Sequence, residues 1–144
     1  MNYTALTEKD LDIITSLYVR YYNENEGRSW TFEKAYRRIR QVLLTPDSYC
    51  LIQETNGVYT GFLMGYIKEY DDLKSYFLEE IVIFNKYQDK GLGSLFIKEL
   101  ENQLQAMDVS MIELMSVNDE KHRFFYEKFS FEKASNLMIM SKFI

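Results

Sequence analysis

A glycine-containing turn between an apolar segment and an amphipathic segment most constrains the fold of this chain. In Ile81-Val82-Ile83-Phe84 four large apolar residues follow one another without alternation, which predicts a strand buried on both faces. After the turn, apolar residues recur at helical spacing through Leu92, Leu95, Phe96, Leu100, Leu104 and Met107. The sequence therefore predicts a buried interior strand that a tight turn joins to a long helix.

The turn itself, Gln88-Asp89-Lys90-Gly91-Leu92-Gly93-Ser94, has the features of an anion site. The first N–H groups of a helix have no partner within the helix and carry partial positive charge, so they can bind a phosphate. Gly91 and Gly93 lack a Cβ, which lets a ligand approach the main chain closely. We therefore expect a pyrophosphate at this turn, with Lys90 adding positive charge. The alternative is that the glycines only permit a tight turn.

Two segments carry a family resemblance. Glu79-Glu80-Ile81-Val82-Ile83, followed by a short linker and Gln88-x-x-Gly91-x-Gly93, resembles the signature of the GNAT family of N-acetyltransferases. The segment with Phe125-Tyr126 and Phe129-x-Phe131 is similar to the tyrosine-bearing helix of that family. The resemblance implies an enzyme that moves an acetyl group from acetyl-CoA to a primary amine, by direct transfer in a ternary complex.

The remaining patterns fit one α/β domain over residues 1–144, with the GNAT-like order β-α-α-β-β-β-α-β-α-β-β and a central mixed sheet flanked by helices. Asn56-Gly57 predicts a hairpin, and Gly61 and Gly65 indicate a bulge or a close backbone approach in the strand that follows. The strand after the 92–107 helix should be parallel to the one before it. We expect helices at about 7–23, 31–44, 92–107 and 119–128, and strands at 2–6, 48–54, 58–70, 76–84, 110–117, 131–135 and 137–143.

The resembled fold implies a coenzyme site along the buried strand. In that fold this strand diverges from the next parallel strand, so the main chain of Ile81, Val82 and Ile83 would pair with the amide-bearing pantetheine arm of coenzyme A. The place of a common family Asn falls at Asp119, one residue after Asn118, and we expect both residues beside the pantetheine.

Acetyl transfer to an amine needs a base, because an alkylamine with a pKa of about 10.4 is almost wholly protonated at neutral pH. Glu79 and Glu80 are the candidates, and strand alternation should point them to opposite faces. We favour Glu79, because polyamine-acetylating relatives carry a carboxylate at the matching distance from the glycine motif; Glu80 is second. Alternatively, both glutamates only solvate the start of the strand.

Tyr126 is the candidate acid for the departing thiolate, as the resemblance implies. Packing is the alternative role, because the chain contains 12 tyrosines. Tyr21, Tyr22 and Trp30 lie where the first two predicted helices meet, a region that borders the acceptor site in the resembled family. With Glu79 and Glu80, these aromatic residues are the expected contacts of a small-molecule or protein amine.

Composition excludes several other classes. A net charge of −5 argues against nucleic-acid binding, and the basic cluster Lys34, Arg37, Arg38 and Arg40 is interpreted as a solvated helix face. The single cysteine, Cys50, and the lack of a long apolar span favour a cytoplasmic protein without membrane contact. No metal site is expected, because no Cys/His cluster occurs. The chain could be a monomer or a homodimer.

Two other functions remain open at this stage. A catalytically weak acyl-CoA-binding regulatory module is favoured by Asp119 at the place of the family Asn. A nucleotide-binding protein could use the same turn, but no Lys-Ser/Thr pair or ribose-binding acid follows at the required spacing.

Overall fold

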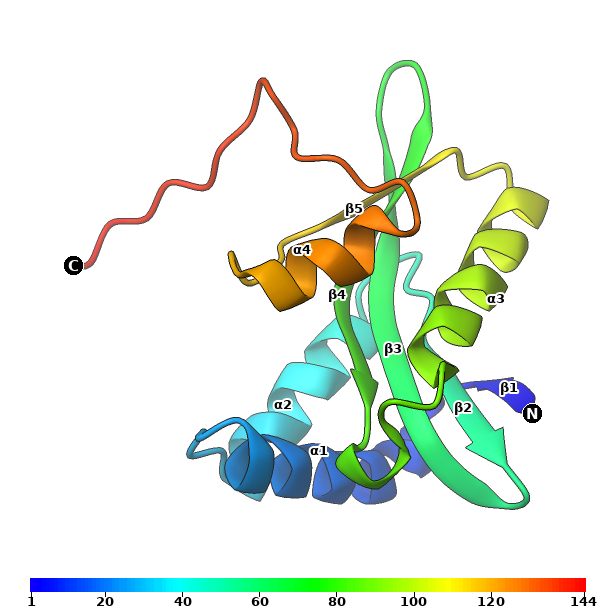
Figure 1. The fold of residues 1–144 in the computed structure, drawn as a ribbon, viewed down its shortest axis with the longest axis vertical. Coiled ribbons are helices and arrows are strands. Elements are labelled where there is room, and N and C mark those ends of the chain that lie inside the picture. The colour runs from blue at the N-terminus through cyan, green and yellow to red at the C-terminus, as the bar shows by residue number, and fades with distance from the viewer.

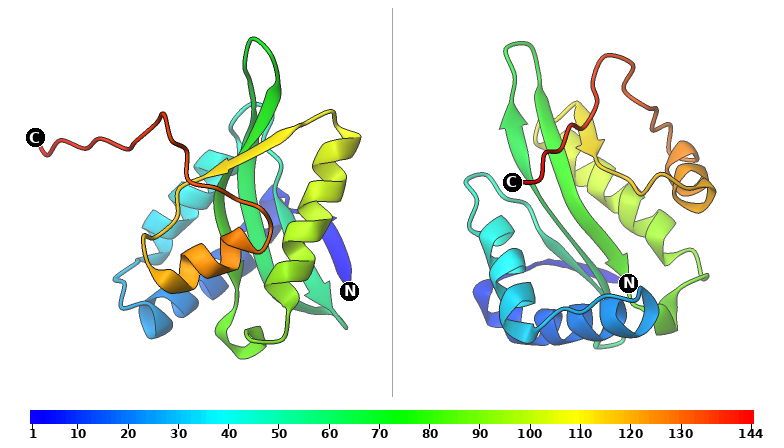
Figure 2. Two further views of the ribbon diagram at one scale, coloured as in Figure 1. Left: turned by 45° about the horizontal axis from the view of Figure 1, so that its top comes forward. Right: turned by 90° about the vertical axis from the view of Figure 1, so that its left-hand side faces the viewer.

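The computed structural model describes residues 1–144 and consists of one mixed sheet with helices on both faces (Figure 1). The five strands lie in the order β1-β2-β3-β4-β5; all neighbours are antiparallel except β4 and β5, which are parallel as predicted. Helices α1 and α2 cover one face, and α3 and α4 lie on the other (Figures 1 and 2). The elements are β1 (Asn2–Ala5), η1 (Glu8–Asp10), α1 (Leu11–Asn25), α2 (Phe32–Leu43), β2 (Leu51–Thr55), β3 (Val58–Glu69), β4 (Lys74–Ile83), η2 (Asn85–Tyr87), α3 (Leu92–Ala106), β5 (Met111–Leu114) and α4 (Glu120–Glu127).

Several local signals in the sequence act as predicted. The Thr7 N–H donates to the Asp10 carboxylate at 2.9 Å, which forms the expected box before the first helix. Asn56 and Gly57 adopt φ values of 52° and 77° in the turn between β2 and β3. Because both central residues of such a hairpin turn need positive φ, Asn-Gly is well suited to this position.

The segment Ile81-Val82-Ile83-Phe84 is buried against both layers, as predicted. Ile81 and Ile83 pack on the cluster that includes Phe96, Ile97, Leu100 and Leu104 of α3. Val82 and Phe84 belong to the opposite cluster, which includes Leu11, Ile14 and Tyr18 of α1 and Ile39 of α2. The two clusters fix the position of β4 between the layers.

A β-bulge at Glu79 changes which way the β4 side chains point. Met64 pairs with Glu80 and Gly65 with Leu78, so Glu79 has no partner in β3. Leu78 before the bulge and Ile81 after it both pack on the α3 side. Glu79 and Glu80 therefore both lie toward α2, where Arg38 contacts each of them. The expectation that the two glutamates point to opposite faces is wrong, because a bulge breaks the alternation.

Gly65 is required at this bulge by close packing. A Cβ on Gly65 would overlap the Phe77 carbonyl oxygen and lie 2.6 Å from the ring of the fully buried Tyr76. We expect Gly65→Ala to lower the free energy of unfolding by about 2–4 kcal/mol, because β3 and β4 must separate to admit the methyl group. The control Gly57→Ala meets no atom within 4 Å and bears only the cost of a positive φ, about 1–2 kcal/mol. Urea denaturation checks both, and an equal loss in the two variants would contradict steric overlap at Gly65.

Strands β4 and β5 pair over only part of their length. The parallel pairing ends at Leu78 opposite Leu114, so the edge of β4 from 79 to 83 has no strand beside it. The two strands diverge beyond this point (Figures 1 and 2). The opening implied by the family resemblance is thus present, and it exposes unpaired main-chain groups of β4.

The two final predicted strands, 131–135 and 137–143, are wrong. Residues 131–144 contain no strand, and their only backbone hydrogen bond joins the Phe131 N–H to the Tyr126 carbonyl. A strand requires a neighbouring strand for its N–H and C=O groups. The apolar pattern indicates an extended segment that can be buried, but it does not specify the partner strand, and residues 131–144 pair with none of the five strands.

Candidate active site

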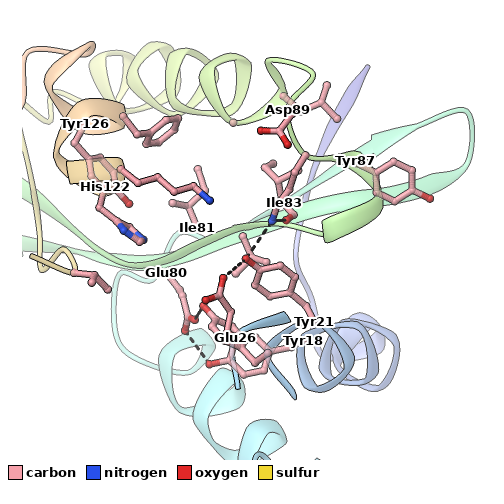
Figure 3. A pocket seen from close by; sticks show the side chains of 18 of the residues that line it. Tyr18, Tyr21, Glu26, Glu80, Ile81, Ile83, Tyr87, Asp89, His122 and Tyr126 are labelled. Atoms are coloured by element: carbon pink, nitrogen blue, oxygen red, sulfur yellow. Dashed lines mark hydrogen bonds between the residues drawn. The ribbon is translucent and has the colours of Figure 1, made fainter. Parts of the chain in front are cut away.

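A cavity of about 1080 Å³ lies beside the open edge of β4 and reaches α1, α2, the start of α3 and α4 (Figure 3). It brings together most of the residues that the sequence singled out. These lining residues are Tyr21, Tyr22, Trp30, Glu80, Ile81, Val82, Ile83, Gln88, Asp89, Gly91, Leu92, Gly93, Ser94, Asp119 and Tyr126. Three predicted residues, Glu79, Lys90 and Asn118, are not among the residues that line it.

The turn before α3 presents a row of free N–H groups. The backbone N–H groups from Asp89 to Ser94 donate no hydrogen bond within the protein, and no side chain caps the helix. Asp89 and Gly91 have φ values of 61° and 77°, which give the turn its tight curvature. An anion can therefore receive hydrogen bonds here and lie at the positive end of α3.

Gln88 and Gly93 shape the same corner. The Gln88 side-chain amide donates to the Ile83 carbonyl at 2.7 Å and to the Tyr21 hydroxyl at 3.1 Å, so it ties the turn to the end of β4 and to α1. A Cβ on Gly93 would come within 3.3 Å of the Phe125 ring of α4. The lack of a side chain at Gly93 thus lets α4 lie close to the start of α3.

Glu80 is the carboxylate at the centre of the site. It accepts hydrogen bonds from the hydroxyls of Tyr18, at 3.1 Å, and of Tyr22. Arg38 donates to the same carboxylate through Nε and Nη2, both at 3.3 Å. Burial, and then the Glu80 charge, raise the pKa values of Tyr18 and Tyr22, so both hydroxyls stay protonated and keep donating at neutral pH.

Glu79 occupies a different position from its neighbour. Its carboxylate lies 3.7 Å from Arg38 Nη2 and makes no hydrogen bond, and its side chain is 23% exposed against 13% for Glu80. Arg38 therefore joins both glutamates, while only Glu80 lines the cavity.

Arg38 is a cavity residue that the sequence interpretation missed. The sequence predicts a solvated helix face for Arg38 together with Lys34, Arg37 and Arg40, and the side chains of those other three residues are exposed. Arg38 is instead half-buried and lines the cavity. Its position three residues after Ala35 and four before Val42, both buried, is the helical spacing that could have separated it from the other basic residues.

Tyr126 faces the cavity from α4, across from Glu80 (Figure 3). Its hydroxyl makes no hydrogen bond within the protein. Burial, followed by the negative charge of Glu80, raises the pKa of Tyr126 above its ordinary value. The hydroxyl is therefore protonated at neutral pH and free to donate to a ligand.

Asp119 stands at the start of α4, the helix that carries Tyr126. Asp119 accepts a hydrogen bond from the His122 N–H at 2.8 Å, which confirms its predicted role as the helix cap. That bond, and a second one to the His122 ring at 2.7 Å, hold the pKa of Asp119 below its ordinary value. The Asp119 carboxylate is thus occupied by its own helix, and His122 lines the cavity next to it.

Aromatic side chains form the end of the cavity near α1. The ring of Tyr18 packs against those of Tyr22 and Trp30, at centroid distances of 4.6 and 5.5 Å. The Tyr21 hydroxyl donates to Glu26 at 2.7 Å. Burial, and then this bond, raise the pKa of Tyr21 to about 12. Tyr18 and Glu26 line the same end of the cavity as the predicted aromatic residues, although the sequence interpretation did not select them.

Cys50 lies away from this site. Its thiol is buried in the core formed with α1 and α2, and burial raises its pKa to about 11. It is not among the residues that line the cavity.

None of the helices combines the length and the apolar character needed to cross a membrane.

Comparisons with known proteins agree with this geometry. Residues 11–131 match the model of the acetyltransferase (GNAT) family. A comparison with curated proteins gives no significant match.

Several solved structures share the fold. A possible acetyltransferase from Clostridium difficile 630 superimposes with a TM-score of 0.83 at 14% identity, covering 99% of this chain and 97% of the other. A ribosomal-protein-alanine N-acetyltransferase from Brucella melitensis biovar Abortus 2308 gives 0.78 at 18% identity, covering 99% and 100%. A predicted acetyltransferase with acetyl-CoA from Clostridium acetobutylicum gives 0.75 at 15% identity, covering 97% and 95%.

The family match spans the turn, the diverging strands and the tyrosine-bearing helix that build the cavity. The chain belongs to the acetyltransferase (GNAT) family and is a GNAT-type N-acetyltransferase.

Proposed function

We propose that this protein transfers an acetyl group from acetyl-CoA to a primary amine, which attacks the thioester directly in a ternary complex. One observation carries the proposal. A single cavity connects the free N–H groups of residues 89–94, the unpaired edge of β4 and the partly buried carboxylate of Glu80.

The residues present suit a coenzyme A thioester as the donor substrate. The free N–H groups at the start of α3 would hold the diphosphate, and the open main chain of Ile81–Ile83 would pair with the pantetheine amides. Lys121 of α4 and Lys128 just after it also line the cavity and add positive charge. The volume of 1080 Å³ is at the upper end of small-molecule sites, roughly 300–1,000 Å³, as a large ligand requires.

Glu80 and Tyr126 carry the proton transfers in this proposal. The Glu80 carboxylate takes a proton from the acceptor ammonium, directly or through water, so that the nitrogen lone pair can form the new C–N bond. When the C–S bond breaks, the Tyr126 hydroxyl donates a hydrogen bond and then its proton to the thiolate. As the amide forms, its nitrogen loses a second proton, which returns to the Tyr126 phenolate through water, and Glu80 releases its proton to the solvent. Arg38 keeps Glu80 in place throughout.

Direct transfer is favoured over a covalent acetyl-enzyme. The only cysteine is buried, has a pKa of about 11 and lies outside the cavity, so little thiolate forms and no donor can reach it. The base in the cavity is a carboxylate beside the expected thioester, which suits attack by an incoming amine.

The acceptor end of the cavity favours a cation. Tyr18, Tyr21, Tyr22 and Trp30 present aromatic rings, and Glu26 supplies a carboxylate near them. Aromatic faces and a carboxylate together attract an ammonium group. These features suit a small-molecule amine or an exposed protein amine.

A panel of amines with detection of the released thiol tests the proposal. The panel includes polyamines, amino acids, aminoglycosides, lysine peptides and a peptide with an N-terminal alanine, the last suggested by the ribosomal-protein-alanine N-acetyltransferase of similar fold. We expect saturable, amine-dependent thiol release with at least one class. Tight acetyl-CoA binding without thiol release from any amine would favour the regulatory binding module.

Replacing Tyr126 should affect turnover more than binding. We expect Tyr126→Phe to lower kcat by about 10- to 100-fold, because the thiolate loses its proton donor, with little change in acetyl-CoA affinity. Tyr36→Phe removes a hydroxyl from α2 outside this cavity and should leave kcat unchanged. Steady-state kinetics and calorimetry measure the two quantities, and an unaltered kcat would exclude Tyr126 from the proton transfer.

A further inference from the structure

A fully buried amide lies in the sheet beside the start of α3. Gln53 stands in the middle of β2 and is as deeply buried as the apolar residues Leu51 and Ile52 before it. Burying an amide costs free energy unless its polar atoms find partners, whereas an apolar side chain would bear no such cost at this depth. The partners of Gln53 therefore indicate why an amide occupies this position.

Both ends of the Gln53 amide are hydrogen-bonded. Its Oε1 accepts from the hydroxyl of Thr60, which is itself buried, at 2.8 Å. Its Nε2 donates to the carbonyl of Leu92, the first residue of α3, at 3.0 Å, and lies 3.5 Å from the Tyr3 hydroxyl. The amide thus ties the start of α3 to the interior of the sheet, beside which that helix begins (Figure 1).

The connection from β4 to α3 is fastened at both ends to one bulge in the sheet. Thr60 is the residue of β3 that the register shift between β2 and β3 leaves without a partner. Its carbonyl accepts from the Phe84 N–H, just after β4, at 2.9 Å. Its hydroxyl holds Gln53, which in turn holds Leu92. The turn that carries the free N–H groups is therefore anchored on either side.

The bond from Gln53 also sets the direction of one of these N–H groups. The Leu92 carbonyl and the Gly93 N–H belong to one planar trans peptide unit, so they point in opposite directions. Gly93 lines the cavity, and its N–H donates to no group of the protein. A Leu92 carbonyl held by Gln53 therefore keeps the Gly93 N–H turned away from the core. Hydrogen bonding at the carbonyl also polarises the peptide unit and strengthens its N–H as a donor.

We propose that Gln53 is a positioning residue for the coenzyme: it fixes the start of α3 so that the free N–H groups of residues 89–94 face one diphosphate. The inference rests on the proposed function, which supplies the diphosphate at this turn. Gln53 is the only side chain outside residues 84–94 that hydrogen-bonds to their main chain. Its loss consequently removes a restraint that no other side chain replaces.

The acetyl-CoA affinity of Gln53→Met tests this role. Methionine fills nearly the same space but has no donor, so the Leu92 carbonyl loses its bond while the core stays packed. We expect the Kd and the KM for acetyl-CoA to rise about 3- to 10-fold, and kcat at saturating acetyl-CoA to stay within about twofold. Calorimetry and steady-state kinetics measure these quantities. Gln53→Leu removes the same donor and should show the same split where the methionine variant is unstable.

Thr60→Val is the matched control, because it removes a hydroxyl from the same buried network and leaves the bond from Gln53 to Leu92 in place. Both substitutions break a buried hydrogen bond, so urea denaturation should show a loss of stability in each. The Kd of Thr60→Val for acetyl-CoA should nevertheless stay within about twofold of that of the natural protein. An equal rise in Kd in the two variants would overturn the positioning role.

A shortened donor separates the diphosphate from the rest of the site. S-Acetylpantetheine keeps the thioester and both amides of the coenzyme but carries no phosphate. We expect Gln53→Met to lower kcat/KM for acetyl-CoA by about 3- to 10-fold and to change kcat/KM for S-acetylpantetheine by less than about twofold. An equal loss with both donors would contradict an action through the diphosphate.

Gly91→Glu, which places a carboxylate at the turn, distinguishes a failure of this inference from a failure of the proposed function. If Gln53→Met binds acetyl-CoA as tightly as the natural protein while Gly91→Glu does not, Gln53 has no positioning role and the diphosphate site stands. If both variants bind acetyl-CoA with unchanged affinity, the diphosphate site and the role of Gln53 are both wrong.

Discussion

Replacing Glu80 by glutamine should lower kcat at neutral pH by about 100- to 10,000-fold, the range associated with loss of a general base. The amide cannot accept a proton from the acceptor, and only the small fraction of amine that is already neutral can then react. The rate of the variant should consequently keep rising with pH toward the amine pKa of about 10.4. Acetyl-CoA affinity should change little, because the coenzyme is expected to bind through the main chain of β4 and the turn.

Glu79→Gln is the matched control, because both glutamates contact Arg38 and both substitutions remove one charge from the same strand. We expect Glu79→Gln to change kcat by less than about threefold. Steady-state kinetics from pH 6 to 10 compare the two variants. A large loss with Glu79→Gln and none with Glu80→Gln would transfer the role of base to Glu79, and an unaltered pH profile in both would exclude either residue.

Glutamate at position 91 should weaken acetyl-CoA binding by at least about 100-fold. A carboxylate near the free N–H groups of residues 89–94 would repel the diphosphate, and a charge pair at about 4 Å is worth about 4 kcal/mol near a protein surface. Because salt screens this repulsion, the loss should shrink as ionic strength rises. Calorimetric titration at two salt concentrations measures both effects.

Two controls separate charge from backbone strain. Gly57 has the same φ of 77° as Gly91, and neither Cβ would meet an atom within 4 Å, so Gly57→Glu reproduces the strain and the charge away from the cavity. Gly91→Ala reproduces the strain at the site without the charge. Both controls should bind acetyl-CoA nearly as tightly as the natural protein, and undiminished affinity of Gly91→Glu would exclude the turn as the diphosphate site.

Much of the cavity around the turn before α3 and the end of β4 was predictable from local patterns. The apolar run at Ile81–Phe84, the two glycines of the turn and the helical spacing after Leu92 each depend on residues close in sequence. The same is true of the cap formed by Asp119. Local backbone preferences and burial periodicity determine such features, so the structure agrees with them.

Local patterns could not predict which of the two carboxylates, Glu79 or Glu80, faces the cavity. The bulge at Glu79 arises from the register in which β4 pairs with β3. The residues that connect these two strands do not specify that register. Arg38, Tyr18 and Tyr22 come from helices far from Glu80 in sequence, and their hydrogen bonds exist only after the layers pack. The prediction of two final strands is wrong for a related reason: an apolar run does not specify the strand with which it pairs.

The sequence by itself determined the order of the elements through β5 and α4, the two buried faces of the interior strand and the tight turn before α3, because these follow from neighbours along the chain. Tertiary structure alone decided that β4 and β5 separate beyond Leu78, that a bulge turns Glu80 toward Tyr18, Tyr22 and Arg38, and that residues 131–144 pair with no strand of the sheet. Each depends on strand register and layer packing, which involve residues distant in sequence.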